Sequence, residues 1–158
     1  MSSNAPSATA TSLNSATAQK IIADILKFCR EKKFNPMAVA VFDARGALLG
    51  LQAEDNCPLM RWKIAIGKAS GAVSMGMGTR RLHNLAVERP HFIAAAADLA
   101  ANGMIPVPGG VLIRDADKKI LGAVGVSGRR RRAPPLLPPV LSPTAARVRP
   151  IVKPMTLI

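Results

Sequence analysis

The sequence predicts a single domain of the α/β (α+β) class, built on a five-stranded antiparallel sheet with helices on both faces. Three observations lead to this prediction. The chain of 158 residues is long enough for one domain with a substantial core and too short for two. Its apolar pattern predicts one helix, two strands, further helices and three strands, in that order. The last strand carries no charged residue on either face, so we expect both faces to be covered.

The first helix is predicted to start after an N-cap at Ser15 or Thr17 and to continue to about Lys33. Small polar residues dominate positions 1–14, which are therefore predicted to form a disordered leader. Asn35-Pro36 ends the helix, because the residue before a proline disfavours the helical conformation. The apolar stripe of the helix consists of Ala18, Ile21, Ile22, Ile25, Leu26 and Cys29.

Two apolar runs, residues 38–43 and 47–52, flank a short turn and predict the first β-hairpin. A second helix is predicted to begin near Leu59, where apolar residues start to recur at helical spacing. One face of this helix has very small side chains, because it consists of Gly67, Ser70, Gly71 and Ser74. Such a face predicts close contact, which we expect to be with the sheet; a partner helix or a flat cofactor is the alternative.

Two shorter helices follow in the prediction. Thr79 can cap one that continues through Val87, and Pro90 suits the first turn of another, which Asn102-Gly103 ends. The second of these helices has an apolar side rich in alanine.

Residues 104–128 are predicted to contain three strands. The first occupies residues 104–107, the second residues 111–113, and the third, residues 120–126, returns antiparallel after a charged connection. Between the first two strands, Pro108, Gly109 and Gly110 supply a turn. The small residues Ala123 and Gly125 indicate that a helix, a ligand or another chain approaches the last strand closely.

The motifs in this segment resemble those of the GlcG/HbpS family. The similarity is carried by PVPGG, then VLIRDAD, then ILGAVGVSG, with an upstream IAxGKA run, and it covers about residues 15–128. The resemblance implies a profilin-like α/β/α domain of three layers that binds haem or a related tetrapyrrole and assembles as a homo-oligomer. It implies, as an alternative, an enzyme or enzyme-associated domain of corrinoid (PduO-like adenosyltransferase) or glycolate metabolism. None of the family's iron contacts maps onto a residue of this sequence by motif.

After Gly128 the sequence departs from the family pattern. The resemblance implies an acidic segment and an Ala-rich C-terminal helix that covers the sheet, whereas residues 129–158 hold seven basic residues, seven prolines and no acid. We interpret this stretch as a disordered tail produced by a frameshift; a genuine extension, a targeting signal and an anionic-surface or nucleic-acid patch are the alternatives. The sheet is then expected to lie open around Leu121, Ala123 and Gly125.

Composition restricts the classes of partner. The net charge is +13, but residues 1–128 account for only +6, from 15 basic and 9 acidic side chains. Aromatic residues make up 3% of the chain, which argues against base stacking and a specific nucleic-acid partner. No stretch has the length and apolarity of a membrane span, and the two cysteines have no CxxC spacing. These features predict a cytoplasmic protein with reduced thiols.

The candidate site residues are Pro108, Gly109, Gly110, His83 and His91. The turn can present backbone N–H groups to an anion such as a haem propionate, although a plain turn between two strands explains the same residues. Each histidine can ligate haem iron, although the neighbours of His83 and His91 favour a solvated surface position for both. No metal-ligand cluster or catalytic motif is present, so the sequence favours a non-catalytic small-ligand module.

Overall fold

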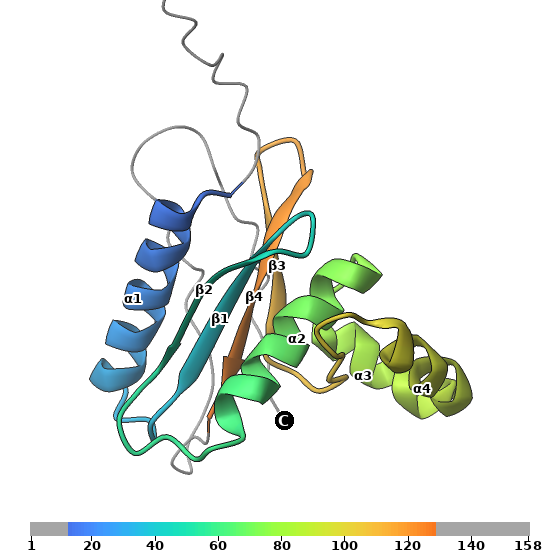
Figure 1. The fold of residues 1–158 in the computed structure, drawn as a ribbon, viewed down its shortest axis with the longest axis horizontal. Helices are drawn as coiled ribbons and strands as arrows, with labels where there is room; N and C mark the ends of the chain where they lie inside the picture. The colour runs from blue at the N-terminus through green and yellow to red at the C-terminus, as the bar shows by residue number, and fades with distance from the viewer. Residues whose placement is uncertain (1–12, 129–158) are drawn as a thin grey trace, which may run out of the picture.

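A computed structural model describes residues 13–128, which form a four-stranded antiparallel sheet with helices on both faces and a projecting pair of helices (Figure 1). The predictions for residues 1–12 and 129–158, including the frameshift and the missing C-terminal helix, lie outside the described residues. The elements are α1 (Ser15–Glu31), β1 (Ala38–Asp43), β2 (Leu48–Ala53), α2 (Arg61–Met75), α3 (Thr79–Glu88), α4 (Pro90–Leu99), β3 (Gly110–Arg114) and β4 (Ile120–Ser127).

The strand order is β2-β1-β4-β3, with every neighbouring pair antiparallel. The centre of the sheet is therefore β1 and β4, whose residues are almost all buried. Alternation along β1 divides the core between the two faces. Val39 and Val41 pack with the apolar stripe of α1, whereas Ala40 and Phe42 pack with alanines of α2.

The N-cap of helix α1 lies one residue before Ser15, the earlier of its two predicted positions. The side chain of Asn14 accepts a hydrogen bond from the Thr17 N–H at 2.8 Å, so Asn14, and neither Ser15 nor Thr17, is the cap. Leu13 is buried in the core beneath α1. The predicted leader is thus wrong for residues 13 and 14, which anchor the start of the helix.

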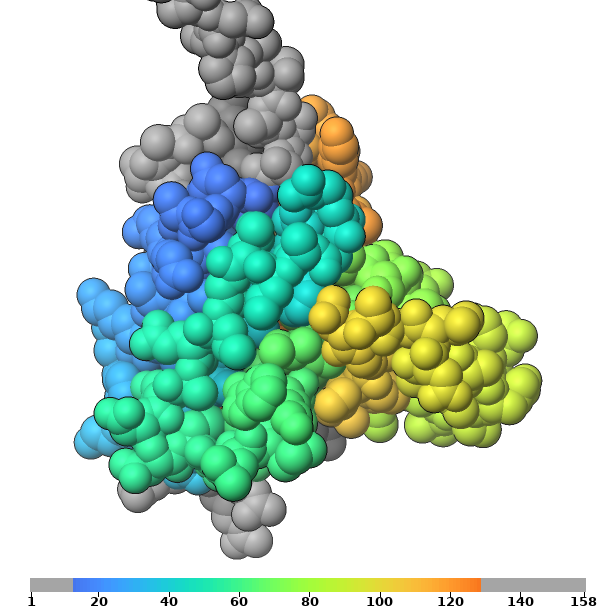
Figure 2. Space-filling view, in the orientation of Figure 1, coloured from blue at the N-terminus to red at the C-terminus, as the bar shows by residue number. Residues whose placement is uncertain are grey.

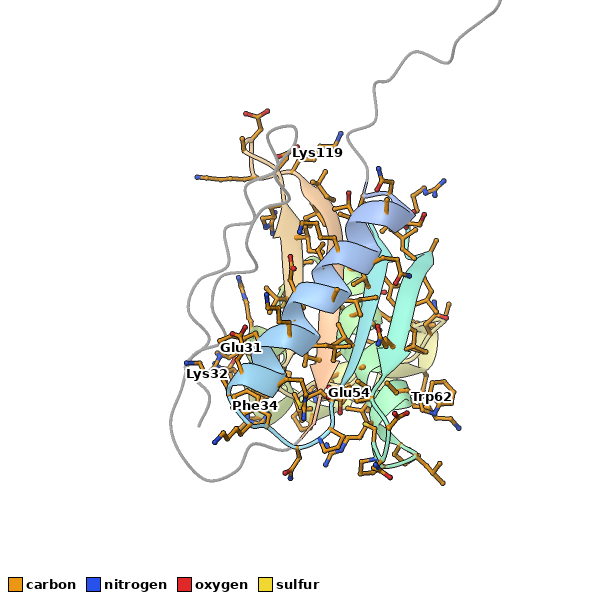
Figure 3. The ribbon with its side chains drawn as sticks, turned by 90° about the vertical axis from the view of Figure 1, so that its left-hand side faces the viewer. Glu31, Lys32, Phe34, Glu54, Trp62 and Lys119 are labelled. Carbon is orange, nitrogen blue, oxygen red and sulfur yellow. The ribbon has the colours of Figure 1, made fainter. Side chains whose placement is uncertain are left out.

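The far end of α1 is tied to the end of β2. The guanidinium of Arg30 forms an ion pair with Glu54 at 2.6 Å, and the other carboxylate oxygen of Glu54 accepts a hydrogen bond from the Met37 N–H at 2.7 Å. Figure 3 shows α1 crossing the sheet, with Phe34 at this end of the helix and Glu54 close to the same end of the sheet. One carboxylate therefore links α1, β1 and β2.

Helix α2 lies against β4 at the small residues that the sequence indicated. A Cβ atom on Gly125 would collide with the backbone oxygen of Ala65 and would lie 2.7 Å from the backbone nitrogen of Ala69. Ala123 packs against Ala72 of the same helix. The close neighbour is thus a helix of this chain.

The sheet is not open in the way the sequence led us to expect. Leu121, Ala123 and Gly125 are all buried. Ala123 and Gly125 are covered by α2, and Leu121 belongs to the cluster that contains the apolar stripe of α1. Both faces of β4 are therefore covered within residues 13–128.

The predicted strand at residues 104–107 is wrong, and four strands are present in residues 13–128 instead of five. Pro106 and Pro108 lack the N–H groups that a strand in this position would donate to its neighbour. The segment packs along α2 instead: the Ile105 N–H donates to the Gly67 carbonyl at 3.1 Å.

The side chains of this segment also explain the small residues of α2. Gly67 lies against the side chain of Ile105, and Gly71 lies against that of Met104. The close contact at Gly67 and Gly71 is thus made by the segment before β3 and not by the sheet. The sheet-facing residues of α2 are instead Ala65, Ala69 and Ala72.

Helices α3 and α4 form a pair that projects from the sheet (Figures 1 and 2). They have their own apolar cluster around Leu82 and Ile93, which Met104 completes. None of the helices formed by residues 13–128 is long and apolar enough to cross a membrane.

Candidate functional site

The turn Pro108–Gly110 lies where β4 ends, between α2 and the start of α3. The Val126 N–H donates to the Gly109 carbonyl at 2.8 Å, as an antiparallel ladder requires. In a regular ladder the Gly109 N–H would donate back to the Val126 carbonyl. Gly109 has a φ of 128°, a conformation that favours glycine, and the Val126 carbonyl instead accepts a hydrogen bond from the Lys68 ammonium at 3.1 Å.

Lys68 is therefore a charged side chain placed at the end of a sheet. Its side chain leaves the buried middle of α2, and the residue is only 8% exposed. Burial, with a smaller contribution from the positive charge of Arg61, lowers the pKa of Lys68 from 10.5 to about 8. Among residues 13–128 no carboxylate forms an ion pair with this ammonium.

Thr79 fixes the other end of the turn. Its hydroxyl oxygen accepts a hydrogen bond from the Gly110 N–H at 2.7 Å, and the residue is fully buried. Since Pro108 has no N–H and Gly110 donates to Thr79, at most Gly109 can offer a backbone N–H to a ligand. The turn is thus built differently from the row of free N–H groups that the sequence suggested for Pro108, Gly109 and Gly110.

Ser127 is the last residue of β4, and its hydroxyl is buried. In the described part of the chain, the Ser127 hydroxyl oxygen and Nη2 of Arg80 are the buried side-chain atoms that have no hydrogen-bond partner. The alternation of β4 places Ser127 on the same face as Gly125, which is the face that α2 covers. The hydroxyl therefore faces the same helix from which Lys68 projects.

The two histidines lie elsewhere, on the projecting helices. His83 is in α3, one turn after Thr79, and His91 is at the start of α4; both are exposed. Within residues 13–128, no hydrogen bond or ion pair connects either histidine to the Pro108–Gly110 turn, and no three His, Cys, Asp or Glu side chains come together. The structure thus separates the predicted site residues into a buried turn and an exposed pair.

Two aspartates, Asp43 and Asp115, accept hydrogen bonds from the backbone of the hairpin turns. Asp43 accepts hydrogen bonds from the N–H groups of Arg45 and Ala47, both at 2.9 Å, and Asp115 accepts similar bonds from the two N–H groups of its own turn. Burial would raise the pKa of Asp43, but these bonds and the Arg45 guanidinium lower it overall. These carboxylates stabilise the hairpin turns through their hydrogen bonds.

The chain matches a known family over all of its described residues. A family model described as haem degrading protein HbpS-like matches residues 13–133. The chain belongs to the HbpS-like family. The resemblance seen in the PVPGG and GVSG motifs is thereby confirmed, and the matched range extends slightly beyond residues 15–128. A comparison with curated proteins gives no match.

Solved structures share the fold of this HbpS-like chain. Klebsiella pneumoniae protein ORFY is 26% identical, with a TM-score of 0.64 over 73% of this chain and 78% of that one. HbpS is 22% identical, with a TM-score of 0.66 over 82% of this chain and 86% of that one. PduOC, solved in complex with haem, is 19% identical, with a TM-score of 0.63 over 74% of this chain and 83% of that one.

Sequence reasoning did not identify Lys68, Thr79 and Ser127 as parts of this candidate site. For Lys68 there was a usable signal, because it is the one charged residue in the otherwise small and apolar stretch 64–73. A charge in the middle of a buried helix requires a partner or a function. Thr79 and Ser127 gave no such signal, since their burial depends on where α2 and α3 meet the sheet.

Proposed function

We propose that this chain is a small-ligand-binding module that takes up haem or a related tetrapyrrole. The observation that carries the proposal is membership of the HbpS-like family, supported by the shared fold of PduOC, which was solved with haem. A bound haem would supply an iron centre for redox or ligand-binding chemistry. No observation on residues 13–128 favours the alternative, an enzyme or enzyme-associated domain of corrinoid or glycolate metabolism.

The described residues fit such a ligand in two respects. His83 and His91 are exposed, so either imidazole can reach an iron atom at the surface of the projecting helices. The Pro108–Gly110 turn lies beside a buried ammonium that has no carboxylate partner in the described part of the chain, and a propionate-bearing ligand suits a positive charge. We propose two separate contributions on different elements: iron ligation by a histidine of α3 or α4, and binding of an acidic group of the ligand beside the turn.

Self-association is part of the proposal. Large apolar side chains are exposed on β2 and near the start of α2, namely Leu48, Leu51, Leu59, Met60 and Trp62. Figure 3 shows Trp62 beside the end of β2. Strand β2 is also an edge of the sheet. We propose that a second copy covers this region. Light scattering of the wild type and of Leu51→Asp tests it, and a monomeric wild type would contradict it.

The cytoplasmic location predicted from the thiols stays a prediction.

Haem titration of the full chain tests the binding function. We expect the Soret band to shift with saturation at micromolar protein, and His83→Ala or His91→Ala to change the spectrum of the complex. Asn84→Ala, an exposed neighbour in α3, is the matched control. If haem gives no Soret shift with the wild type, the proposal fails, and corrinoid turnover by that protein would favour the enzymatic alternative.

A further inference from the structure

We propose that Lys68 is the anion-binding group of this domain and that it takes a carboxylate of the ligand, with the Ser127 hydroxyl as a second donor. The inference deepens the proposed function and, for a tetrapyrrole, rests on it. The chemistry that is recognised is a carboxylate, whether it is carried by a tetrapyrrole or by a small organic acid.

The first argument is the charge of Lys68. A buried ammonium is costly unless an opposite charge and hydrogen bonds accompany it. The residue is 8% exposed and its ammonium has one acceptor in the described residues, the Val126 carbonyl at 3.1 Å. An ammonium has three N–H donors, and that carbonyl accepts from one of them.

The second argument is the charge around Lys68. Arg61, two turns earlier on α2, acts on Lys68 electrostatically and repels its charge. The first turn of α2 contains no acidic residue, and no side chain caps the start of this helix. Arg61 and Lys68 therefore add their positive charges in this part of the helix, and an anion would be stabilised there.

The third argument is Ser127, which is independent of the charge. Ala123 packs against Ala72 and Gly125 against Ala65 and Ala69, so β4 runs toward the N-terminal end of α2. Ser127 is two residues further along the same face, and its buried hydroxyl has no partner in residues 13–128. It follows directly after Val126, whose carbonyl binds the ammonium. The ammonium and the hydroxyl thus lie at the same end of β4, and both can donate to a carboxylate.

The turn above the ammonium determines how a ligand reaches it. Gly109 is buried against Lys68, and a Cβ atom at this position would lie 2.7 Å from the lysine nitrogen. The ammonium therefore lies directly against the backbone of Gly109. Val107 is 40% exposed and Pro108 is partly exposed, so the turn lies at the surface. In the proposal, a ligand reaches the ammonium from this exposed side of the turn.

The experiment compares acids with their esters in the full chain. Haem and haem dimethyl ester are titrated against the wild type, Lys68→Met, Lys68→Arg and Lys63→Met, the last being an exposed lysine of the same helix as control. We expect the wild type and Lys63→Met to prefer haem over its ester by about tenfold or more, because a charge-assisted hydrogen bond is lost on esterification. Lys68→Met abolishes that preference, and Lys68→Arg retains part of it.

A second arm does not depend on haem. Acetate and propionate, compared with chloride at equal ionic strength, should raise the Tm of the wild type and of Lys63→Met but not that of Lys68→Met. If haem fails to bind while these carboxylates still stabilise the wild type through Lys68, the proposed function is wrong and the carboxylate site stands. A wild type that shows neither an acid-over-ester preference nor carboxylate stabilisation overturns the inference, whether or not the variants fold. The inference is also overturned if Lys68→Met prefers haem over its dimethyl ester as strongly as the wild type does.

Discussion

Replacing Gly125 by alanine should destabilise the domain strongly, although the change adds only one methyl group. The new Cβ would collide with the Ala65 carbonyl and lie 2.7 Å from the Ala69 nitrogen. Both atoms belong to the backbone of α2, so neither can rotate away, and the helix must move from β4 as a unit. Overpacking alone costs about 1–3 kcal/mol, and the alanine contacts of α2 loosen as well. We expect a loss of about 3 kcal/mol or more, a large part of a typical domain's roughly 5–15 kcal/mol.

Urea unfolding followed by circular dichroism measures this loss. Gly78→Ala is the control, since its Cβ would lie 3.4 Å from the Gly110 carbonyl, an ordinary contact, in a backbone conformation open to alanine. We expect Gly78→Ala to cost less than about 1 kcal/mol, near the value of a weaker helix cap. If Gly125→Ala unfolds at the same urea concentration as Gly78→Ala, the close approach of α2 to β4 is not a determinant of stability, and the reasoning is refuted.

Three further predictions concern single side chains. Because burial, and to a lesser extent Arg61, lowers the pKa of Lys68 from 10.5 to about 8, the folded chain binds fewer protons than the unfolded chain between these values. The free energy of unfolding should therefore rise with pH from about 8 to 10.5, by up to roughly 3 kcal/mol. The difference between the wild type and Lys68→Met in urea melts at several pH values measures this rise, and a constant difference would contradict it. Asn14→Ala removes the cap of α1 and should lower stability by about 1 kcal/mol in the same assay, whereas Asn14→Ser should restore most of it; equal losses would argue against capping. Thr79→Val leaves the buried Gly110 N–H without its acceptor and should cost about 1–3 kcal/mol, with faster amide exchange at Gly110; an unchanged exchange rate would show that another acceptor replaces the hydroxyl.

Local patterns predicted most of the fold. The amphipathic stripe of α1, the apolar runs of the first hairpin and the charged turn before β4 all depend on neighbours in sequence. The strand at residues 104–107 failed for the opposite reason. Its apolar residues looked suited to a sheet, but two prolines remove the N–H groups that a strand needs. Met104 and Ile105 pack instead against the glycines of α2. That packing depends on a helix that lies far earlier in the chain.

The site was less predictable than the fold. Gly109 and Gly110 were identified because glycines in a turn are visible locally, but their neighbours were not. Lys68 reaches the turn only because α2 lies across β4, and the Val126 carbonyl is open to it only because Gly109 leaves the ladder. The histidines were visible as residue types, yet their separation from the turn follows from the way α3 and α4 project.

The α3–α4 pair is a part of this protein that can change separately from the sheet and the helices on it. The pair has an apolar cluster of its own, and α4 contacts the rest of the fold mainly through α3. His83 and His91 both belong to this appendage, whereas Lys68 belongs to the rigid helix on the sheet. Under the proposed function, mutations or insertions in α3 and α4 would change iron ligation while the sheet end that carries Lys68 keeps its shape, so the two proposed halves of ligand recognition would be free to diversify independently.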